Sequence, residues 1–360
     1  MTSLDKNKVI LGMSGGVDSS VTAILLKEQG YAITGVSLNL YNCDRPLGKG
    51  CCTPADRLDA RKICERLEFP FAIVDVRSRF KTAVIDYFAE EYLQGRTPLP
   101  CAPCNRDVRF QALLEQADAQ GAYWIATGHY ARVEDSNGTR ALLRGVDSKK
   151  DQSYFLFGLG EDILQRLLLP IGGYRKEEVR QLAKVWHLPV HDKPDSQELC
   201  FLSGEDHSHF IRENYSERTI APGDFVDREG RVLGKHRGLP AYTIGQRRGV
   251  EVNAGRRLYV TALDPSANRI VLGSKESLMA KGLVATGVQP PLNLRGGDRG
   301  SYTVKIRSTH PGVGATLQCD ADTVTVHFSE PQMAVTPGQA AVFYQGEKLI
   351  GGGWIHQALC

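Results

Sequence analysis

The stretch Leu11–Ser20, LGMSGGVDSS, places glycines, serines and an aspartate between two apolar runs. A glycine-rich turn that leaves a parallel strand gathers backbone N–H groups at a helix N-terminus, and such a turn binds phosphate. The stretch lacks the Gly-Lys-Ser/Thr ending of a Walker loop and the G-x-G-x-x-G spacing of a dinucleotide-binding turn. Its own pattern is S-G-G-x-D-S, over Ser14–Ser19, which predicts a phosphate-binding loop. A serine-capped helix after a tight turn is the alternative interpretation of the same residues.

Three cysteines in polar or Pro-rich segments are candidates for sulfur chemistry. Cys101 and Cys104 lie in RTPLPCAPCNRDVRF, and Cys200 lies in KPDSQELCFLSG. We expect Cys104 to begin a helix, where the helix N-terminus favours the thiolate and Arg106 and Arg109 add positive charge one turn further on. Because buried cysteines are common, we interpret the other six as structural. These are Cys43, Cys51, Cys52, Cys64, Cys319 and Cys360.

Alternating strands and helices must position these residues. The expected strands are Val9–Leu11, Ala32–Leu40, Phe71–Val76 and a strand that begins at Tyr123. The expected helices are Ser19–Gln29, Pro54–Leu67, Phe80–Leu93, a helix from Cys104 that stops at Gly121, and Lys176–Trp186. This alternation predicts an α/β fold with a doubly wound parallel sheet. In such sheets ligands bind beyond the carboxyl ends of the strands, where the glycine-serine loop lies.

The sequence changes character after about Leu202. Charges, glycines and prolines become dense, and RRLYVTAL and RIVLGS read as strands. From Lys281 onward short strands follow one another: LVATGV, SYTVKIRS, ATLQCD, TVTVHFS and AAVFYQG. Regular short strands without helices predict a small β-barrel. We therefore expect a large α/β domain over residues 1–204, a small central linker domain over 205–278 and a C-terminal β-barrel over 279–360.

Composition limits the class of protein only loosely. The 360 residues are 42% hydrophobic, which allows two or three packed domains. The net charge of +3 neither demands nor excludes a nucleic-acid partner, since local patches matter more than the total. We see no signal-peptide pattern and no apolar run long enough for a bilayer, so we expect a cytoplasmic protein without a membrane partner. Nine cysteines in a reducing compartment favour catalytic or metal-binding roles.

The loop pattern resembles the PP-loop of ATP pyrophosphatases, which adenylate an oxygen of their substrate and release pyrophosphate. Over essentially its full length the chain resembles the tRNA-specific 2-thiouridylase family. The matching stretches, in the family's order, are GMSGGVDSSV, RTPLPCAPCNRDVRF, IATGHYAR, KDQSYFLFGL, PDSQELCFL, AYTIGQRRG, VKIRS and GQAAVFYQGEKLIGGGWI. The resemblance implies a transferase, a tRNA-uridine 2-sulfurtransferase, that acts on the wobble uridine of tRNA.

The resemblance also implies site residues, position by position. ATP would be bound by Gly12, Met13, Ser14, Gly15, Gly16, Val17, Asp18 and Ser19, with Leu38 and Gly128 at the adenine. Magnesium would be held by Asp18. The tRNA would be contacted by His129, Lys150, Asp151, Gln152, Arg307, Ser308 and Gln345. The basic turn TIGQRRG, with Arg247 and Arg248, suits backbone phosphates. Taken alone, each of these side chains also fits a core or solvated role.

The resemblance assigns Cys104 as nucleophile and Cys200 as the cysteine that carries persulfide sulfur. Adenylation makes the C2 oxygen of uridine a leaving group, the persulfide sulfur attacks C2, and AMP departs. Cys104 then frees the product and leaves a disulfide bond with Cys200. The base must be flipped into the pocket, because C2 is inaccessible in a stacked loop. The implied partners are tRNA and a sulfur-donor protein, either a cysteine desulfurase or a sulfur relay protein, and we expect a monomer.

One position departs from the family pattern. Many members carry an aspartate three residues before the nucleophile, where this chain has Cys101. An alternative is that Cys101, Cys104 and Cys200 ligate an iron–sulfur cluster with an open iron, whereas structural zinc sites want four ligands. Two further hypotheses are an ammonia-using PP-loop ligase, which gives the cysteines no role, and a non-catalytic tRNA-binding protein, which would not need the intact loop.

Overall fold

The computed structural model describes residues 4–41, 53–136, 138–195, 199–202, 204–215, 221–252, 255–289, 301–320 and 323–360. Three of the expected structural cysteines, Cys43, Cys51 and Cys52, lie outside these residues. The chain divides into two units. The first consists of Met1–Val84, Cys101–Gly204 and Glu347–Leu349, and the second of Ile85–Pro100, Glu205–Gly346 and Ile350–Cys360.

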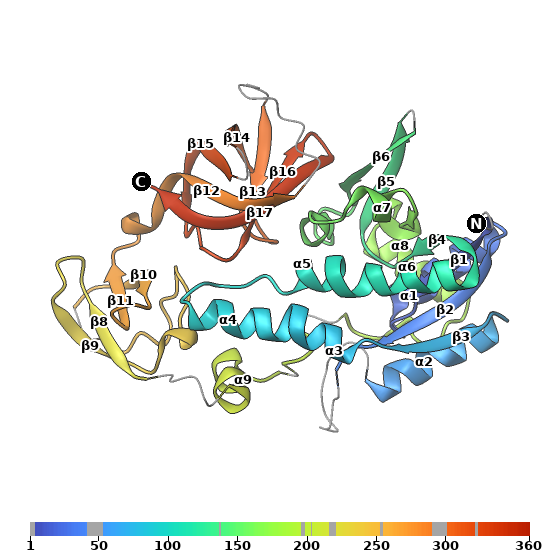
Figure 1. The fold of residues 1–360 in the computed structure, drawn as a ribbon, viewed down its shortest axis with the longest axis horizontal. Helices are drawn as coiled ribbons and strands as arrows, with labels where there is room; N and C mark the ends of the chain where they lie inside the picture. Colours follow the sequence, from blue (N-terminus) through green and yellow to red (C-terminus); the bar gives the residue numbers. More distant parts are fainter. Residues whose placement is uncertain are drawn as a thin grey trace. The chain divides into compact units, whose positions relative to one another are not determined.

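The first unit is built on a parallel sheet of five strands (Figure 1). The strand order is β3-β2-β1-β4-β7, and every pair in it is parallel. The strands are β1 (Asp5–Gly12), β2 (Ala32–Asn39), β3 (Phe71–Asp75), β4 (Ala122–Ala126) and β7 (Leu167–Leu168). Because the order reverses between β1 and β4, the switch point of the sheet lies there, and β1 ends at the glycine-serine loop. The predicted doubly wound sheet is confirmed.

The predicted helices of this unit are also present. They are α1 (Val17–Glu28), α2 (Pro54–Arg66), α6 (Phe110–Gln120) and α8 (Lys176–Val185). The N-terminus of α2 is capped by Thr53, which accepts from the Asp56 N–H while the Asp56 carboxylate accepts from the Thr53 N–H. Residues from β1, α1, α2 and α8 share one apolar core, so the strand and the helices around the loop are packed as one body.

The helix that carries Cys104 begins earlier than expected. One turn, α5 (Cys101–Pro103), precedes the π-helical segment η2 (Cys104–Arg109), which continues into α6. The expectation that Cys104 is the first helical residue is therefore wrong. Pro103 is tolerated in this turn because the first N–H groups of a helix have no intrahelical partner. The predicted stop at Gly121 is confirmed, since that residue caps α6 with φ of 65°.

A second predicted helix also contains a π-helical segment. The stretch expected as Phe80–Leu93 consists of α3 (Arg77–Phe80), η1 (Lys81–Asp86) and α4 (Tyr87–Leu93). Short elements of the first unit were not predicted. They are the hairpin β5 (Ala131–Ser136) and β6 (Thr139–Arg144), the helix α7 (Glu161–Leu164), and the 3-10 turns η3 (Ser153–Leu156) and η4 (Pro170–Gly173). The Asn-Gly pair between the two hairpin strands was an available signal.

The second unit contains a four-stranded sheet of order β10-β11-β8-β9. Its strands are β8 (Gly223–Val226), β9 (Val232–His236), β10 (Tyr259–Asp264) and β11 (Arg269–Gly273), and only the last two were predicted. The helix α9 (His207–Asn214) and the 3-10 turn η5 (Leu239–Ala241) were missed as well. Phe225, Val260 and Ile270 form the centre of a small separate core, so these strands bury their own apolar face.

A closed barrel follows the 3-10 turn η6 (Glu276–Leu278) in the second unit. Its strands are β12 (Met279–Gln289), β13 (Tyr302–Lys305), β14 (Val313–Asp320), β15 (Thr323–Met333), β16 (Ala340–Gln345) and β17 (Lys348–Leu359). They run in the order β12-β15-β14-β13-β16-β17, and pairing of β12 with β17 closes the ring (Figure 1). In β14 the buried Val313, Ala315 and Leu317 alternate with exposed residues. The predicted β-barrel is confirmed, although β17 was not foreseen.

Gly282 in β12 tests this barrel. A Cβ at that position would lie 2.2 Å from the carbonyl oxygen of Val326 in β15. Gly282→Ala should therefore lower the free energy of unfolding by about 1–3 kcal/mol, the usual cost of overpacking, as measured by urea denaturation. Gly173→Ala is the control, because a Cβ there meets nothing within 4 Å. Equal stability of the two variants would contradict the close approach of β12 and β15.

Candidate nucleotide and thiol site

The predicted phosphate loop connects β1 to α1 and has a tightly constrained backbone. Gly15 has φ of 73°, and a Cβ there would lie 2.0 Å from the Asp56 carbonyl oxygen, so only glycine fits. The hydroxyls of Ser14 and Ser19 lie 3.2 Å apart, and the Ser20 hydroxyl donates to the Gly16 carbonyl at 2.8 Å. The serines of the loop therefore help to hold its shape, a role that the sequence pattern did not indicate.

The other residues expected at ATP lie in or beside this loop. A Cβ on Gly128, in the segment after β4, would lie 2.8 Å from the backbone carbon of Asp18 and 2.9 Å from the nitrogen of Ser19. Gly128 thus touches the start of α1. The side chains of Met13, Val17 and Leu38 are buried (2%, 4% and 6% exposed), so the first two offer a ligand only their backbone. Leu38 lies in β2, one residue before its end, where it packs in the core.

Asp18, in the first turn of α1, is fully engaged by two neighbours that sequence reasoning missed. The Tyr130 hydroxyl donates to Asp18 Oδ1 at 2.7 Å. Lys176 Nζ donates to both carboxylate oxygens, each at 2.8 Å. Carboxylate oxygen is the ligand type that magnesium prefers, so the residue fits the expected role. Here, however, an ammonium group occupies the place where a divalent cation would neutralise the carboxylate.

A network of charges extends from Lys176. Its Nζ also lies 2.9 Å from Asp195 Oδ1, and Asp195 in turn contacts Lys150 Nζ at 2.6 Å and Arg180 at 2.9 Å. Burial alone would raise the pKa of Asp195, but hydrogen bonds from Lys150 and Lys176 outweigh it and lower the pKa to about 2. Burial and the nearby Asp18 carboxylate raise the pKa of Tyr130, so its hydroxyl stays a neutral donor.

Lys193 joins the segment that precedes Cys200 to the loop. Its Nζ donates to the Gly15 carbonyl at 3.0 Å, to Asp56 at 2.6 Å and to Asp59 at 2.9 Å. Residues 193–195 are thus attached at one end to the phosphate loop and at the other to the Lys176 network.

The candidate nucleophile is buried and has a cationic neighbour. Cys104 is 6% exposed, and Arg109 Nε donates to its Sγ at 3.4 Å. The Arg109 guanidinium therefore lies at the Cys104 sulfur, whereas Arg106 forms an ion pair with Asp107 at 2.6 Å. Cys101 lies one turn earlier and is partly buried. Residues three apart share one face of a helix, so Cys101 and Cys104 point to the same side.

The segment of Cys200 reaches the same part of the first unit. Cys200 is partly buried, and the ring of the next residue, Phe201, packs edge-on against Phe80 of α3 at 6.0 Å. The helix α3 in turn packs against η2, which begins at Cys104. The helix of Cys104 and the segment of Cys200 therefore contact one common element.

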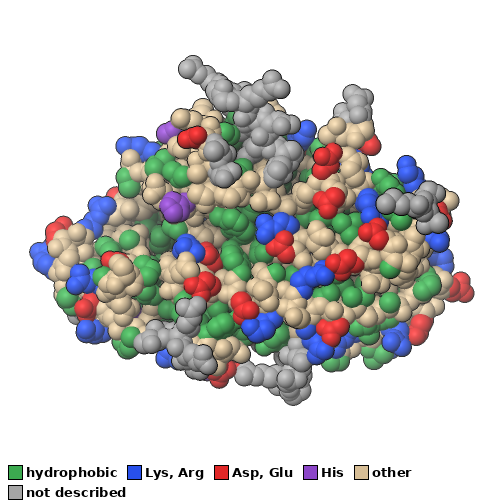
Figure 2. Space-filling view, in the orientation of Figure 1, with side chains coloured by type: hydrophobic (Ala, Val, Ile, Leu, Met, Phe, Trp, Pro, Cys, Tyr) green, Lys and Arg blue, Asp and Glu red, His purple; other side chains and the backbone are tan. Residues whose placement is uncertain are grey.

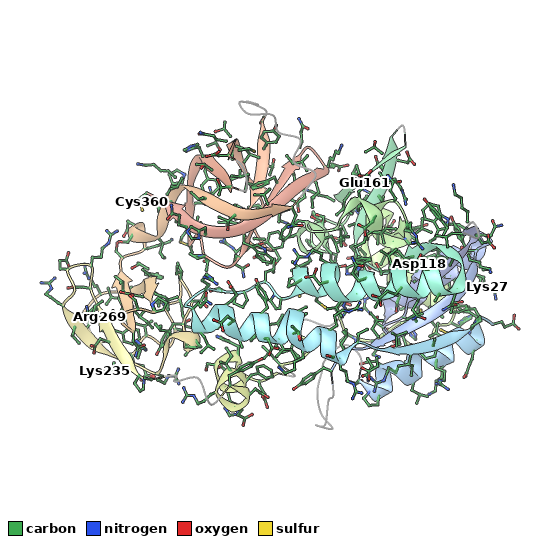
Figure 3. The ribbon with its side chains drawn as sticks, viewed as in Figure 1. Lys27, Asp118, Glu161, Lys235, Arg269 and Cys360 are labelled. Atoms are coloured by element: carbon green, nitrogen blue, oxygen red, sulfur yellow. The ribbon has the colours of Figure 1, made fainter. Side chains whose placement is uncertain are left out.

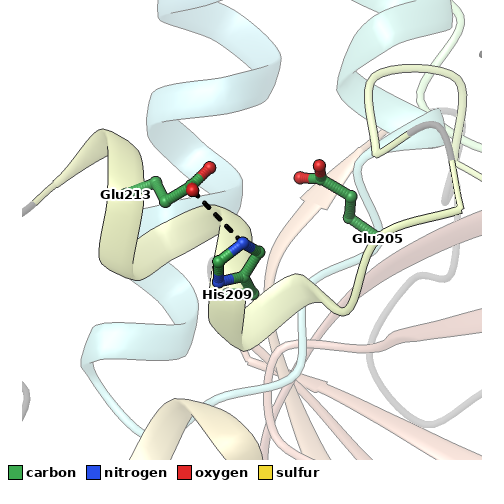
Figure 4. Close-up of side chains that lie close together, drawn as sticks. All are labelled: Glu205, His209 and Glu213. Atoms are coloured by element: carbon green, nitrogen blue, oxygen red, sulfur yellow. Dashed lines mark ion pairs between the residues drawn. The ribbon is translucent and has the colours of Figure 1, made fainter.

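A metal-binding geometry is found elsewhere. In the described part of the chain, the three ligand atoms that lie within 4.8 Å of one another belong to Glu205, His209 and Glu213 and not to the three cysteines (Figure 4). The His209 imidazole lies 3.2 Å from Glu213, one helical turn away, and both side chains are exposed. A surface ion pair accounts for this arrangement, and we assign no metal to it.

His129 lies beside the nucleophile's helix. Its Nδ1 lies 2.7 Å from the Thr127 hydroxyl, and its ring packs 5.7 Å from Phe110 of α6. Burial, with a smaller contribution from the Arg109 charge, lowers the pKa of His129 to about 3. The imidazole is therefore neutral, and a contact with RNA would be a hydrogen bond rather than an ion pair.

The other tRNA candidates of the first unit have structural partners. Lys150 is paired with Asp195. Asp151 accepts two backbone N–H groups at 3.0 and 3.1 Å, and the Gln152 side chain accepts the N–H of Tyr130 at 2.9 Å. These side chains shape the turn before η3, a role that the sequence did not indicate.

In the second unit the tRNA candidates lie apart. Arg307 and Gln345 are exposed and Ser308 is partly buried. Because β13 and β16 are antiparallel with Lys305 opposite Val342, Arg307 follows one end of the pair and Gln345 terminates the other. Arg247 and Arg248 are exposed in their turn. On the face in Figure 2, basic and acidic side chains of the described residues are interspersed and form no single basic patch.

The cysteines expected to be structural differ in burial. Cys64 is buried, which raises its pKa to about 12, and Cys319 is partly buried. Cys360 is exposed, so its structural interpretation is wrong; the preceding end of β17 has already left the core (Figure 3). Among the helices of the described residues, none combines the length and the apolar character that crossing a membrane requires.

Comparison with known families accounts for this architecture. A model of the tRNA methyl transferase HUP domain matches residues 7–204, one of its PRC-barrel domain matches 208–274, and one of the aminomethyltransferase β-barrel domain matches 277–355. The sheet and loop of the first unit are thus those of the HUP-domain class. Within it, the chain belongs to the tRNA-specific 2-thiouridylase MnmA family.

Full-length relatives support this assignment. The chain is 45% identical to the tRNA-specific 2-thiouridylase MnmA of Carboxydothermus hydrogenoformans, with 100% of both chains covered. It is 44% identical to that of Heliobacterium modesticaldum, with 97% of this chain and 92% of the relative covered. Among solved structures, NMN synthetase from Francisella tularensis is 17% identical over 59% of this chain and 78% of its own, with a TM-score of 0.34, a likeness too low to support an argument.

The low pKa of His129 gives a test of this site. Because the folded pKa of about 3 lies below the ordinary 6.5, the folded protein should not protonate His129 at pH values between 8 and 5. NMR of the ring Cε1–H signal, assigned with His129→Gln, should show no titration there. Protonation favours the unfolded chain, so wild type should lose stability relative to the variant as the pH falls below 6.5. A titration midpoint of the His129 signal near pH 6.5 would contradict the burial of its imidazole ring.

Proposed function

We propose that this protein carries out ATP-dependent 2-thiolation of the wobble uridine of tRNA, with sulfur supplied by a persulfide on Cys200. Membership of the 2-thiouridylase family makes the chain a sulfurtransferase enzyme. The observation that carries the mechanism is that the helix of Cys104 and the segment of Cys200 contact α3 in the unit that also holds the nucleotide loop.

Adenylation would take place at the loop after β1. Backbone N–H groups at the start of α1 would bind the ATP phosphates, and the absence of side chains on Gly15 and Gly16 lets them approach closely. Magnesium, when bound, would neutralise phosphate charge, and Asp18 is the residue that would hold it. The C2 oxygen of uridine attacks the α-phosphate, pyrophosphate leaves, and the oxygen becomes part of an AMP leaving group.

Sulfur transfer would use the two thiols in turn. The terminal sulfur of the Cys200 persulfide attacks C2, and the C2–O bond breaks as AMP departs. The Cys104 sulfur, to which Arg109 Nε donates, then attacks the Cys200 sulfur as a thiolate. The bond between the Cys200 sulfur and the sulfur attached to C2 breaks, and its electron pair stays on the uridine sulfur. The products are 2-thiouridine and a Cys104–Cys200 disulfide. A thiol reductant and a sulfur-donor protein would restore the persulfide.

The tRNA would be bound through dispersed contacts. Arg307 and Gln345 lie at opposite ends of one strand pair, so they would meet different parts of the RNA and would read its shape rather than its sequence. His129, near Cys104, would approach the flipped base as a neutral donor or acceptor. A cytoplasmic monomer remains our prediction for the cellular form.

Asp18→Ala tests the nucleotide half of this proposal. The variant should lose tRNA-dependent pyrophosphate release, because the carboxylate at the loop is removed, while tRNA binding in a filter assay changes by no more than a few-fold. Asp192→Ala is the control, since that carboxylate is exposed and outside the network. Normal pyrophosphate release by Asp18→Ala would refute the assignment. Release that does not respond to tRNA would instead favour an ammonia-using ligase.

Cysteine variants test the sulfur half. Cys104→Ser and Cys200→Ser should each eliminate 2-thiouridine in tRNA analysed by mass spectrometry, because a hydroxyl cannot carry persulfide sulfur. Cys360→Ser, at an exposed thiol, should not. Cys101→Ser distinguishes the persulfide relay from iron–sulfur chemistry. If the relay operates, the variant should keep substantial thiolation activity. If the three cysteines ligate a cluster, the variant should lose both iron and activity. Wild type that is free of iron and still thiolates tRNA from a persulfide donor would exclude the cluster.

A further inference from the structure

Lys176 is a buried cation at the nucleotide loop to which the mechanism above gives no task. Lys176 is 8% exposed and is the first residue of α8. The ammonium group contacts Asp18 at 2.8 Å and Asp195 at 2.9 Å, and it lies 5.6 Å from the centre of the Tyr130 ring. A lysine that is buried to this extent is stable only while anions or strong acceptors surround it.

The carboxylates that pair with the Lys176 ammonium group differ in how many other cations they contact. The ion pairs among the described residues join Lys176, Lys150 and Arg180 to Asp18 and Asp195. A third carboxylate, Asp147, accepts the backbone N–H of Lys176 at 3.0 Å. Asp195 already has two other cationic partners, so Asp18 is the main counter-charge of Lys176. If Asp18 turns to magnesium, Lys176 needs a new anion, and the anion that arrives together with magnesium is the phosphate chain of ATP.

The neighbouring Lys193 does not share this property. Its partners are the carboxylates of Asp56 and Asp59 and the carbonyl of Gly15. Neither carboxylate has a role in nucleotide binding in the function proposed above, so binding of ATP would leave Lys193 neutralised. Of these two lysines next to the loop, Lys176 is the one whose carboxylate partner, Asp18, would bind the magnesium that arrives with ATP.

We propose that Lys176 is a phosphate-binding residue that exchanges Asp18 for the pyrophosphate portion of ATP when the nucleotide binds. The inference rests on the ATP dependence proposed above. Lys176 would add a side-chain cation to a loop that otherwise offers the phosphates of ATP backbone N–H groups and serine hydroxyls. Before ATP arrives, the same ammonium keeps the Asp18 carboxylate neutralised. After adenylation, its charge remains beside the departing pyrophosphate.

Binding of magnesium-ATP and of adenosine to the full-length chain, measured by calorimetry without tRNA, tests the proposal. Lys176→Met should weaken ATP binding about 10- to 100-fold, the range for a lost charged hydrogen bond, and should leave adenosine binding within about twofold. Lys184→Met is the matched control, because Lys184 lies on the same helix and is exposed. It should bind both ligands as wild type does.

Two more variants keep the test decisive if Lys176→Met does not fold. Lys176→Gln can still donate to Asp18 but has no charge, and Lys176→Arg keeps the charge. The proposal expects Lys176→Arg to bind ATP more tightly than Lys176→Gln, with both folded by circular dichroism. Wild-type ATP affinity in Lys176→Gln, or equal losses for ATP and adenosine, would overturn it and leave thiolation untouched. A wild-type protein that does not bind ATP would overturn the proposed function as well.

Discussion

The contact between Asp18 and Lys176 holds the nucleotide site together. It joins the first turn of α1 to the first turn of α8, two helices separated by more than a hundred residues of chain. The same ammonium group also contacts Asp195, and Lys193, two residues earlier in the chain, donates to the Gly15 carbonyl. The glycine-serine loop and residues 193–195 are therefore parts of one electrostatic structure, in which the position of each charge depends on the others.

The sequence was most informative where chemistry is local. The pattern Ser14–Ser19 predicted a glycine-rich loop between a strand and a helix, and the structure places such a loop between β1 and α1, with a positive φ at Gly15. The alternation of strand and helix patterns along the first half of the chain predicted the parallel sheet, which the structure confirms. Local signals also explain one error: Pro103 suggested a boundary before Cys104, but proline is tolerated in a first helical turn.

Long-range partners were beyond sequence reasoning. Lys176 lies in an ordinary amphipathic helix, and nothing near it in the chain indicates a partner 158 residues away. Asp151 and Gln152 show the converse limit, because their polar side chains matched a tRNA-contacting motif but accept backbone N–H groups. The donors are Gly145 and Ser153 for Asp151, and Tyr130 for Gln152. A motif records which residue types occur together and does not separate those that meet a ligand from those that shape the turn.

The closure of the barrel has a consequence for biosynthesis. The ring is completed only when β17 pairs with β12, and some sixty residues separate the end of one from the start of the other. While the chain is still being made, β12 pairs with β15 but presents its other edge to solvent, and such an edge invites pairing with a second chain. The open edge of β12 is thus a site for aggregation of the nascent chain after β15 has emerged and before β17 has. A stalled ribosome in that interval would leave an open sheet in place of a barrel.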